Sequence, residues 1–262
     1  MSLDNIRIVL VNTKHTGNIG AVARAMKNMG LVDLRLVDPK NALDRQAYER
    51  AAGAVDVLDK AVICASIDEA VADCSLVVGT SARGRRIPWP LLPPRECAAR
   101  AVGEASTARV ALLFGREDRG LTNEELQRCN LHLHIPTDDE YSSLNLAMAV
   151  QVICYELRLA WLDAVAGNTA DSNNSDINAD PMAQWDIDFA TADELERFFV
   201  HLEQTLTDLG FLKPRAPKQL MTRLRRLFTR TRLDEMEISI LRGVLTAAQS
   251  WVDKSRGKST DP

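Results

Sequence analysis

The sequence predicts an α/β protein built on a mostly parallel sheet that is covered by helices on both faces. Short apolar runs alternate with amphipathic stretches from Ile6 to about Gly167, and this alternation is typical of repeated β-α units. The runs have the length of strands and are rich in branched residues, as in RVALLFG from Arg109. Such runs are expected of parallel strands that are buried on both sides.

The expected elements follow one another along the chain. Six strands are predicted, beginning at Ile6, Asp33, Ala61, Ser75, Arg109 and Leu131. Helices are predicted between them, over residues 19–29, 45–57, 67–72, 94–104 and 122–129. Gly30 directly follows the first of these helices, where a glycine favours helix termination.

Residues 144–166 predict a long helix that is apolar on nearly all sides, and it includes the run LNLAMAVQVICYELRLAW. Such a helix needs burial on more than one face, against the sheet and against a partner subunit.

The alternation of strands and helices predicts one domain over residues 1–167. The small, polar and acidic residues of 168–190 predict a flexible linker, and residues 191–262 predict a helical extension that begins with a helix from Asp193.

The charge is distributed unevenly. The chain of 262 residues has a formal net charge of −4, so the total gives no sign of a nucleic-acid partner. Every charged residue from Lys213 to Arg232 is nevertheless basic. This run is either a solvated helix face or a patch that contacts phosphates, for which arginine is well suited. We predict RNA contacts for Arg223, Arg225, Arg226 and Arg230.

The five cysteines are odd in number and widely spaced, without a C-x-x-C pair. They indicate neither a zinc site nor a disulfide framework, and we expect buried free thiols in a reducing cytoplasm. No metal is expected. The sequence shows no apolar run of eighteen residues and no signal-peptide pattern, so neither a membrane span nor secretion is predicted.

Three polar or glycine-containing loops follow three of the predicted strands, namely GTSARGRR, GREDRGLTNEEL and PTDDEYSSLN. In an open α/β sheet, ligands bind beyond the carboxyl ends of the strands. Gly79, Gly115 and Gly120 would allow close backbone approach or a positive φ, or they are simple turn glycines. A dinucleotide or triphosphate fingerprint is absent, which disfavours a small-molecule oxidoreductase. The residues alone predict a small-molecule site at this edge of the sheet.

Three segments together resemble a known family. NIGAVAR from Asn18, FGREDRGL from Phe114, and IPT with SSLNLAMAV from Ile135 resemble the three motifs of the SPOUT superfamily, in its TrmH-like branch of ribose 2′-O-methyltransferases. The resemblance extends over the whole chain, including the trailing helices. It implies a trefoil knot in the C-terminal part of the α/β domain, a homodimer, and S-adenosylmethionine as methyl donor. The implied substrate is tRNA, at cytidine or uridine 32 of the anticodon loop.

Two alternatives remain beside that function. One is the same chemistry on ribosomal RNA or at another tRNA position. The other is an RNA-binding protein that has lost catalysis on a retained fold. Asn18, Arg24 and the loop glycines are all present, which argues against the second alternative.

The resemblance also implies roles for individual residues. Asn18, Arg24 and Ser143 are the expected catalytic residues, although Asn18 and Ser143 could equally be helix caps and Arg24 a solvated side chain. Because arginine stays protonated, we expect Arg24 to bind a phosphate and stabilise the developing alkoxide. Glu117 is expected to fix Arg24 or a loop amide. The expected cofactor contacts are Thr80, Ser81, Ala82, Gly115, Glu117, Gly120, Leu121, Ile135, Ser142, Ser143, Leu144 and Asn145.

The loop after the fourth predicted strand is basic, and we expect Arg83, Arg85 and Arg86 to meet the RNA backbone there. Trp89 either stacks on a base or is a buried aromatic braced by prolines. His15, after the first strand, is a candidate for acid–base chemistry or for packing within the turn.

Overall fold

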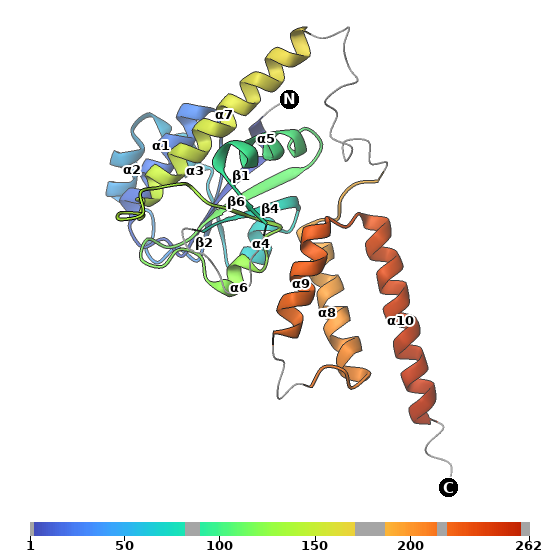
Figure 1. The fold of residues 1–262 in the computed structure, drawn as a ribbon. Helices are drawn as coiled ribbons and strands as arrows, with labels where there is room; N and C mark the ends of the chain where they lie inside the picture. Colours follow the sequence, from blue (N-terminus) through green and yellow to red (C-terminus); the bar gives the residue numbers. More distant parts are fainter. Residues whose placement is uncertain (1–2, 82–89, 171–186, 214–218, 258–262) are drawn as a thin grey trace.

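The computed structural model describes residues 3–81, 90–170, 187–213 and 219–257. Its α/β unit contains a seven-stranded sheet in the order β3-β2-β1-β6-β4-β7-β5, and all paired strands run parallel (Figure 1). The strands are β1 (Ile6–Val11), β2 (Asp33–Val37), β3 (Val62–Cys64), β4 (Cys74–Thr80), β5 (Leu91–Leu92), β6 (Arg109–Phe114) and β7 (Leu131–Leu133). The predicted parallel sheet is confirmed.

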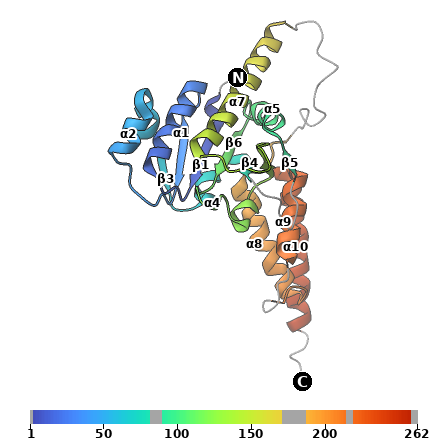
Figure 2. The same ribbon diagram turned by 60° about the vertical axis from the view of Figure 1, so that its left-hand side comes forward.

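Helices cover both faces of the sheet, as predicted (Figures 1 and 2). One face packs against α1 (Thr16–Met29), α2 (Arg45–Ala51), α3 (Val55–Asp59), α5 (Pro94–Glu104) and α7 (Leu146–Ala170). The other face packs against α4 (Ile67–Val71) and α6 (Asn123–Leu126). Short 3-10 turns lie at Leu3–Asn5 and Ala52–Ala54.

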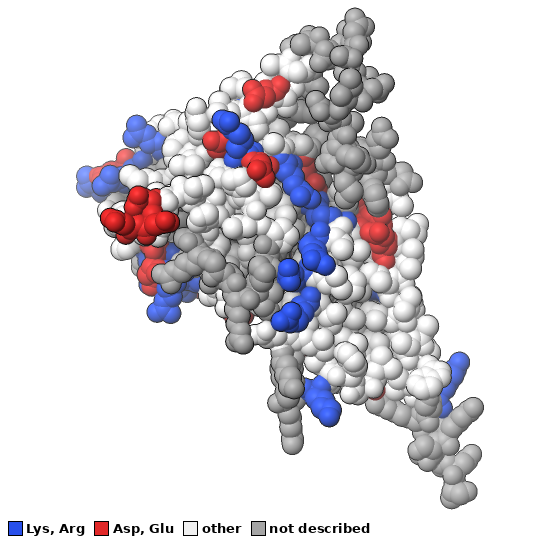
Figure 3. Space-filling view, viewed as in Figure 1, with Lys and Arg blue, Asp and Glu red and all other residues white. Residues whose placement is uncertain are grey.

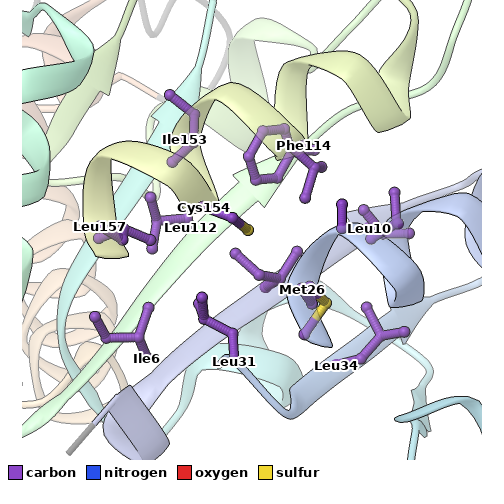
Figure 4. Close-up of a cluster of buried hydrophobic side chains, with 14 of the residues drawn as sticks. Ile6, Leu10, Met26, Leu31, Leu34, Leu112, Phe114, Ile153, Cys154 and Leu157 are labelled. Atoms are coloured by element: carbon purple, nitrogen blue, oxygen red, sulfur yellow. The ribbon is translucent and has the colours of Figure 1, made fainter. Parts of the chain in front are cut away.

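The core follows from the alternation of side chains along each strand. In β1, Ile8 and Leu10 point to one face while Val9 and Val11 point to the other, and all four are buried. Figure 4 shows the larger cluster, in which Met26 of α1 and Cys154 of α7 meet side chains of β1 and β6. Both faces of the central strands are therefore apolar, which explains their continuous hydrophobic runs.

Two elements differ from the prediction. The expected helix over residues 45–57 is broken into α2 and α3, because Ala52 adopts a φ of +50° between them. Strand β5 was not predicted, since two residues between prolines carry no periodic signal. The end of the first helix is as predicted: Gly30 has a φ of +84°, and its backbone N–H donates to the last turn.

Helix α7 buries one side and exposes part of the other. Val150, Ile153 and Leu157 face the core, whereas Met148 is 63% exposed and Tyr155 is 49% exposed. The sequence predicted burial on more than one face, and the described residues of this chain leave the outer face uncovered. No helix among the described residues is long and apolar enough to cross a membrane.

The C-terminal unit consists of α8 (Ala192–Asp208), α9 (Leu220–Thr231) and α10 (Glu235–Gly257). Its small core is aromatic, and the ring of Phe198 meets that of Phe228 edge-on at 5.0 Å between centroids. The predicted linker contains the end of α7, because residues 168–170 belong to that helix. Residues 171–186 of the predicted linker lie outside the described residues. All five cysteines are buried free thiols, as predicted.

One arginine of the sheet has a buried side chain. Arg7 of β1 is 2% exposed, and its guanidinium donates to the carboxylates of Asp33 and Asp73 at 2.9 and 2.6 Å. It also donates to the carbonyl oxygen of Ala70 at 2.7 Å. Arg109 pairs with Asp73 from the neighbouring strand β6. A buried guanidinium is tolerated only when it is paired in this way.

We expect this network to give the fold an acid-sensitive component. Burial raises the pKa of Asp73, but the hydrogen bonds from Arg7 and Arg109 outweigh burial and lower the pKa to about 2. The ionised form therefore stabilises the fold above about pH 4, and this contribution is lost as the pH falls toward 2. Asp73→Asn should lower the free energy of unfolding at pH 7 by about 1–2 kcal/mol and flatten its decline between pH 4 and 2, as measured by urea unfolding.

The matched control is Asp59→Asn, which removes an exposed carboxylate from the end of α3. The free energy of unfolding of this variant should equal that of the unmodified protein at pH 7 and between pH 4 and 2. An unchanged acid slope in Asp73→Asn would show that the Arg7 network does not set it.

Candidate active site

A cavity opens at the carboxyl ends of β4, β6 and β7. It has a volume of about 1010 Å³ including its open mouth, which is large enough for a nucleoside-sized ligand. Ten of the predicted cofactor residues line it, and they are Thr80, Ser81, Gly115, Glu117, Gly120, Leu121, Ile135, Ser142, Ser143 and Leu144. The structure thus brings together three loops that are far apart in the sequence. Ala82 lies outside the described residues.

The loop after β6 forms one wall of this cavity and turns back on itself. The backbone N–H of Gly120 donates to the carbonyl oxygen of Arg116 at 2.8 Å, and Gly120 has a φ of +68°. A Cβ on Gly115 would lie 2.0 Å from the carbonyl carbon of Gly120 and 2.2 Å from the nitrogen of Leu121. Only glycine fits at position 115, because the two ends of the loop touch there.

Arg116 holds this loop in place. Its guanidinium donates to both carboxylate oxygens of Glu125, at 2.8 and 3.1 Å, and to the carbonyl oxygen of Gly120 at 3.2 Å. Glu125 also completes a capping box with Thr122 at the start of α6. The loop is therefore tied to the helix that follows it, and sequence reasoning did not assign this role to Arg116.

A chain of side-chain hydrogen bonds joins the three sequence motifs at the edge of the cavity. The amide of Asn18 on α1 donates to Glu117 Oε1 at 2.9 Å, and the amide of Asn145 donates to Asn18 Oδ1 at 3.1 Å. Glu117 also accepts the backbone N–H groups of Lys14 and His15, each at 3.2 Å. Glu117 thus fixes backbone amides and Asn18 rather than Arg24.

The same contacts keep Glu117 ionised. Burial raises the pKa of Glu117, but the hydrogen bonds from Asn18 and from backbone N–H groups outweigh burial and bring the pKa below its ordinary value. A neutral Glu117 would accept these hydrogen bonds more weakly. The link between α1 and the cavity wall is therefore an ionic hydrogen-bonded one at neutral pH.

Two capping alternatives from the sequence are wrong. Helix α1 begins at Thr16 with His15 as its cap position, so Asn18 lies inside the first turn with its side chain turned to Glu117. Helix α7 is capped by Asn145, whose Oδ1 accepts the backbone N–H of Ala147 at 2.9 Å. Ser143 is thus not the cap and instead lines the cavity.

A second, shallower hollow adjoins the first, and it is lined by His15, Gly17, Asn18, Ala21, Gln46, Arg50 and Asn145. Arg24 lies on the same face of α1 as Gly17 and Ala21, since the spacing is four and three residues. It is exposed, and among the described residues it forms no hydrogen bond or ion pair. Its guanidinium is thus free to meet a bound ligand beside the cavity.

The sequence did not predict several residues that line the cavity, namely Phe114, Arg116, Asp118, Arg119, Leu133, Thr137, Leu146 and Ala149. Most lie next to predicted residues in the same loops, so their nearness in sequence was an available signal. Gly79 does not line the cavity. A Cβ at that position would lie 2.7 Å from the sulfur of Cys129. The close packing of the sheet against α6 and Cys129 therefore requires this glycine.

The predicted RNA-binding arginines fall into two groups. Arg83, Arg85 and Arg86 lie outside the described residues, as does Trp89. On α9, Arg223, Arg226 and Arg230 share one face. Arg225 points elsewhere and forms a bidentate ion pair with Glu196 of α8, at 2.5 and 2.7 Å, with its guanidinium over the ring of Phe199.

Two family models match the chain. Residues 5–155 match the SpoU rRNA Methylase family. Residues 193–259 match the C-terminal domain of the tRNA methyltransferase TrmJ. The two matches together cover both the α/β unit and the C-terminal helices.

Individual relatives are similar over nearly their whole length. The tRNA (cytidine/uridine/adenosine-2′-O-)-methyltransferase TrmJ of Pseudomonas aeruginosa is 53% identical over 248 residues, covering 94% of this chain and 95% of that protein. The tRNA (cytidine/uridine-2′-O-)-methyltransferase TrmJ of Salmonella typhimurium is also 53% identical, covering 98% of this chain and 100% of its own. The crystal structure of TrmJ from Z. mobilis ZM4 has a TM-score of 0.75 at 33% identity, covering 92% of this chain and 97% of that one.

Proposed function

Because this chain belongs to the SpoU rRNA Methylase family and carries a TrmJ C-terminal domain, we propose that it methylates a ribose 2′-hydroxyl of tRNA with S-adenosylmethionine as donor. The observation that carries the proposal is the hydrogen-bonded chain from Asn145 through Asn18 to Glu117. It connects all three motif segments at the mouth of one cavity. The 53% identity to tRNA 2′-O-methyltransferases over nearly the full chain supports the same substrate class.

The cavity fits the proposed donor. Its apolar wall, with Leu121, Leu133 and Ile135, suits an adenine ring, while the loop from Gly115 to Gly120 exposes backbone polar groups at close range. The side chains of Ser142 and Ser143 can hydrogen-bond the polar parts of the donor. Thr80 contributes mainly backbone, since its hydroxyl donates to the carbonyl oxygen of Leu113 at 2.9 Å.

The residues at the edge of the cavity position the acceptor. When bound, S-adenosylmethionine supplies a sulfonium methyl group that is already activated, so alignment and charge stabilisation are the tasks of the protein. Asn18, fixed by Glu117, orients the acceptor ribose. Arg24 binds the adjacent phosphate and stabilises the developing alkoxide, and the phosphate or water receives the hydroxyl proton.

The finer parts of the proposal concern the substrate position and the assembly. We place the modified nucleotide at cytidine or uridine 32 of the anticodon loop, in the cytoplasm.

A homodimer is supported by the outer face of α7, where Met148, Val152, Tyr155 and Leu162 are exposed at helical spacing. A trefoil knot in residues after β6 is supported by the sheet order, in which β4 lies between the later strands β6 and β7.

The proposed domains follow the same division. Residues 1–167 form the methyltransferase domain, residues 168–190 the linker, and residues 191–262 an RNA-binding extension. The three helices of the extension share a core of their own, separate from the two cores that flank the sheet, which supports this division.

The test is transfer of label from S-adenosylmethionine to unmodified tRNA transcripts, followed by nuclease mapping. We expect label in the ribose of nucleotide 32, and none in a matched transcript with a 2′-deoxynucleotide at that position. Transcripts with each of the four bases at position 32 will report the base preference. Label in a base, at another nucleotide or only in ribosomal RNA would contradict the proposal, as would the absence of transfer.

A further inference from the structure

The C-terminal unit is joined to the α/β unit of its own chain by a buried ion pair. Arg232 follows α9 with a φ of +57°, is 6% exposed, and pairs with Glu104 at the end of α5. Glu104 also accepts the hydroxyl of Ser75 at 2.6 Å, and the guanidinium of Arg232 lies 4.6 Å from the ring centroid of Phe189. These contacts fix the end of α9 against the end of α5.

Other contacts strengthen this junction. The amide of Asn130, just before β7, donates to the carbonyl oxygen of Thr229 at 3.5 Å, and its Oδ1 accepts the backbone N–H of Val77 at 2.8 Å. The backbone N–H of Asp193 donates to the carbonyl oxygen of Ala72 at 3.3 Å. The orientation of α9 relative to the sheet is therefore set by several independent contacts.

The junction lies at the opposite end of β4 from the cavity. Ser75 is at the amino end of β4 and Thr80 at its carboxyl end, which places them about 17 Å apart at 3.3 Å per residue. Helix α5 starts just after β5 and ends at Glu104, so it runs from the cavity end of the sheet toward the junction. A ligand that follows α5 would thus pass from the cavity to α9.

Both helices present arginines to solvent along this path. Arg95 and Arg100 are exposed on α5, and Arg223 and Arg230 are exposed on the outer face of α9. Burial lowers the pKa of Arg232, whereas the carboxylate of Glu104 raises it. The positive charge of Arg100 also lowers this pKa, so Arg100 lies near the junction. Figure 3 shows Lys and Arg side chains forming a stripe across this region of the molecule.

These arginines form few ion pairs among the described residues. Among the described residues, Arg100, Arg223, Arg226 and Arg230 form no ion pair, and Arg95 only approaches Glu156 at 3.6 Å while remaining 83% exposed. Arg223 and Arg230 lie about 10 Å apart along α9, so they would contact different phosphates. In a chain of net charge −4, such a row fits an extended polyanion.

We propose that Arg95 and Arg100 of α5 continue the basic face of α9 into one track for the tRNA sugar-phosphate backbone, held in register by the Arg232–Glu104 ion pair. The proposal rests on the proposed function and extends it. The α9 helix of each chain would bind the tRNA whose anticodon loop reaches the cavity of that same chain. The anticodon loop would lie at the edge of the cavity beside Asn18 and Arg24, and the adjoining stem would follow α5 to α9.

The test compares Arg95→Gln/Arg100→Gln with Lys60→Gln, an exposed cation at the end of α3 near the opposite edge of the sheet. Filter binding of a tRNA transcript is measured over a range of KCl concentrations. We expect the double variant to bind about tenfold more weakly at low salt and to lose about two from the slope of log affinity against log salt. Its KM for tRNA should rise, with kcat and affinity for S-adenosylhomocysteine unchanged. The control should behave like the unmodified protein.

A second pair of variants tests the junction. Arg232→Glu should weaken tRNA binding, and Glu104→Arg/Arg232→Glu should restore it, with thermal melting as a check on folding. An unchanged affinity and salt slope in Arg95→Gln/Arg100→Gln would overturn the track, whatever the junction variants do. Because this readout is binding, it is distinguishable from a failure of methyl transfer in the unmodified protein, which would overturn the proposed function instead.

Discussion

Gly115→Ala is expected to abolish measurable binding of S-adenosylhomocysteine. The added methyl group would lie 2.0 Å from the backbone carbon of Gly120 and 2.2 Å from the nitrogen of Leu121, and backbone cannot move aside as a flexible side chain can. The loop would have to open, which removes one wall of the cavity. We also expect a loss of about 1–3 kcal/mol in the free energy of unfolding. Calorimetry and urea unfolding measure the two effects.

Gly103→Ala is the matched control. Gly103 lies in α5, and a Cβ there would meet nothing within 4 Å. The substitution should leave cofactor affinity unchanged and raise stability by about 0.5–1 kcal/mol, because alanine loses less entropy than glycine on entering a helix. Equal cofactor affinity in the two variants would show that the closed loop at Gly115 is not part of the binding site.

Arg24→Ala is expected to lower kcat for methyl transfer by about 100- to 1,000-fold, the range seen when one group that stabilises transition-state charge is removed. Affinity for S-adenosylhomocysteine should not change, because Arg24 does not line the cavity. Stability should also be retained, because the side chain is exposed. Single-turnover assays at saturating tRNA separate the chemical step from binding.

Arg197→Ala serves as its control, since Arg197 is exposed on α8 and pairs only with Asp193 of the same helix turn among the described residues. This variant should turn over normally. Arg24→Lys keeps the charge but loses the planar fork, so partial activity is expected from it. Normal turnover in Arg24→Ala would remove Arg24 from the mechanism.

The fold was largely predictable because its strands are apolar on both faces and its helices are amphipathic. The exceptions have local causes. The positive φ of Ala52 breaks a helix where the sequence shows only small residues, and β5 is too short to carry a period. Helical spacing could have separated Arg225 from the basic face of α9, since it is out of phase with Arg223 and Arg230.

The cavity residues could be predicted only through motif resemblance, because their loops meet through the sheet order rather than through the sequence. The pairing of Asn18 with Glu117 joins positions 99 residues apart, and that of Arg232 with Glu104 joins positions 128 residues apart. No periodicity reports such contacts. The alternative caps at Asn18 and Ser143 were reasonable from residue type, and they failed because Asn145 and the backbone at His15 occupy those positions.

The sheet order has a consequence for synthesis of the protein. Strand β4 pairs with β6 and β7, both of which follow it in the chain, so its edges remain open until much later residues have left the ribosome. Distant pairings of this kind form slowly. In a nascent chain the cavity is therefore incomplete until the start of α7 is available. At a concentration 100 times its Kd, the proposed donor would add about 2.7 kcal/mol of stability on binding, and only chains that have reached α7 would receive this protection from proteolysis.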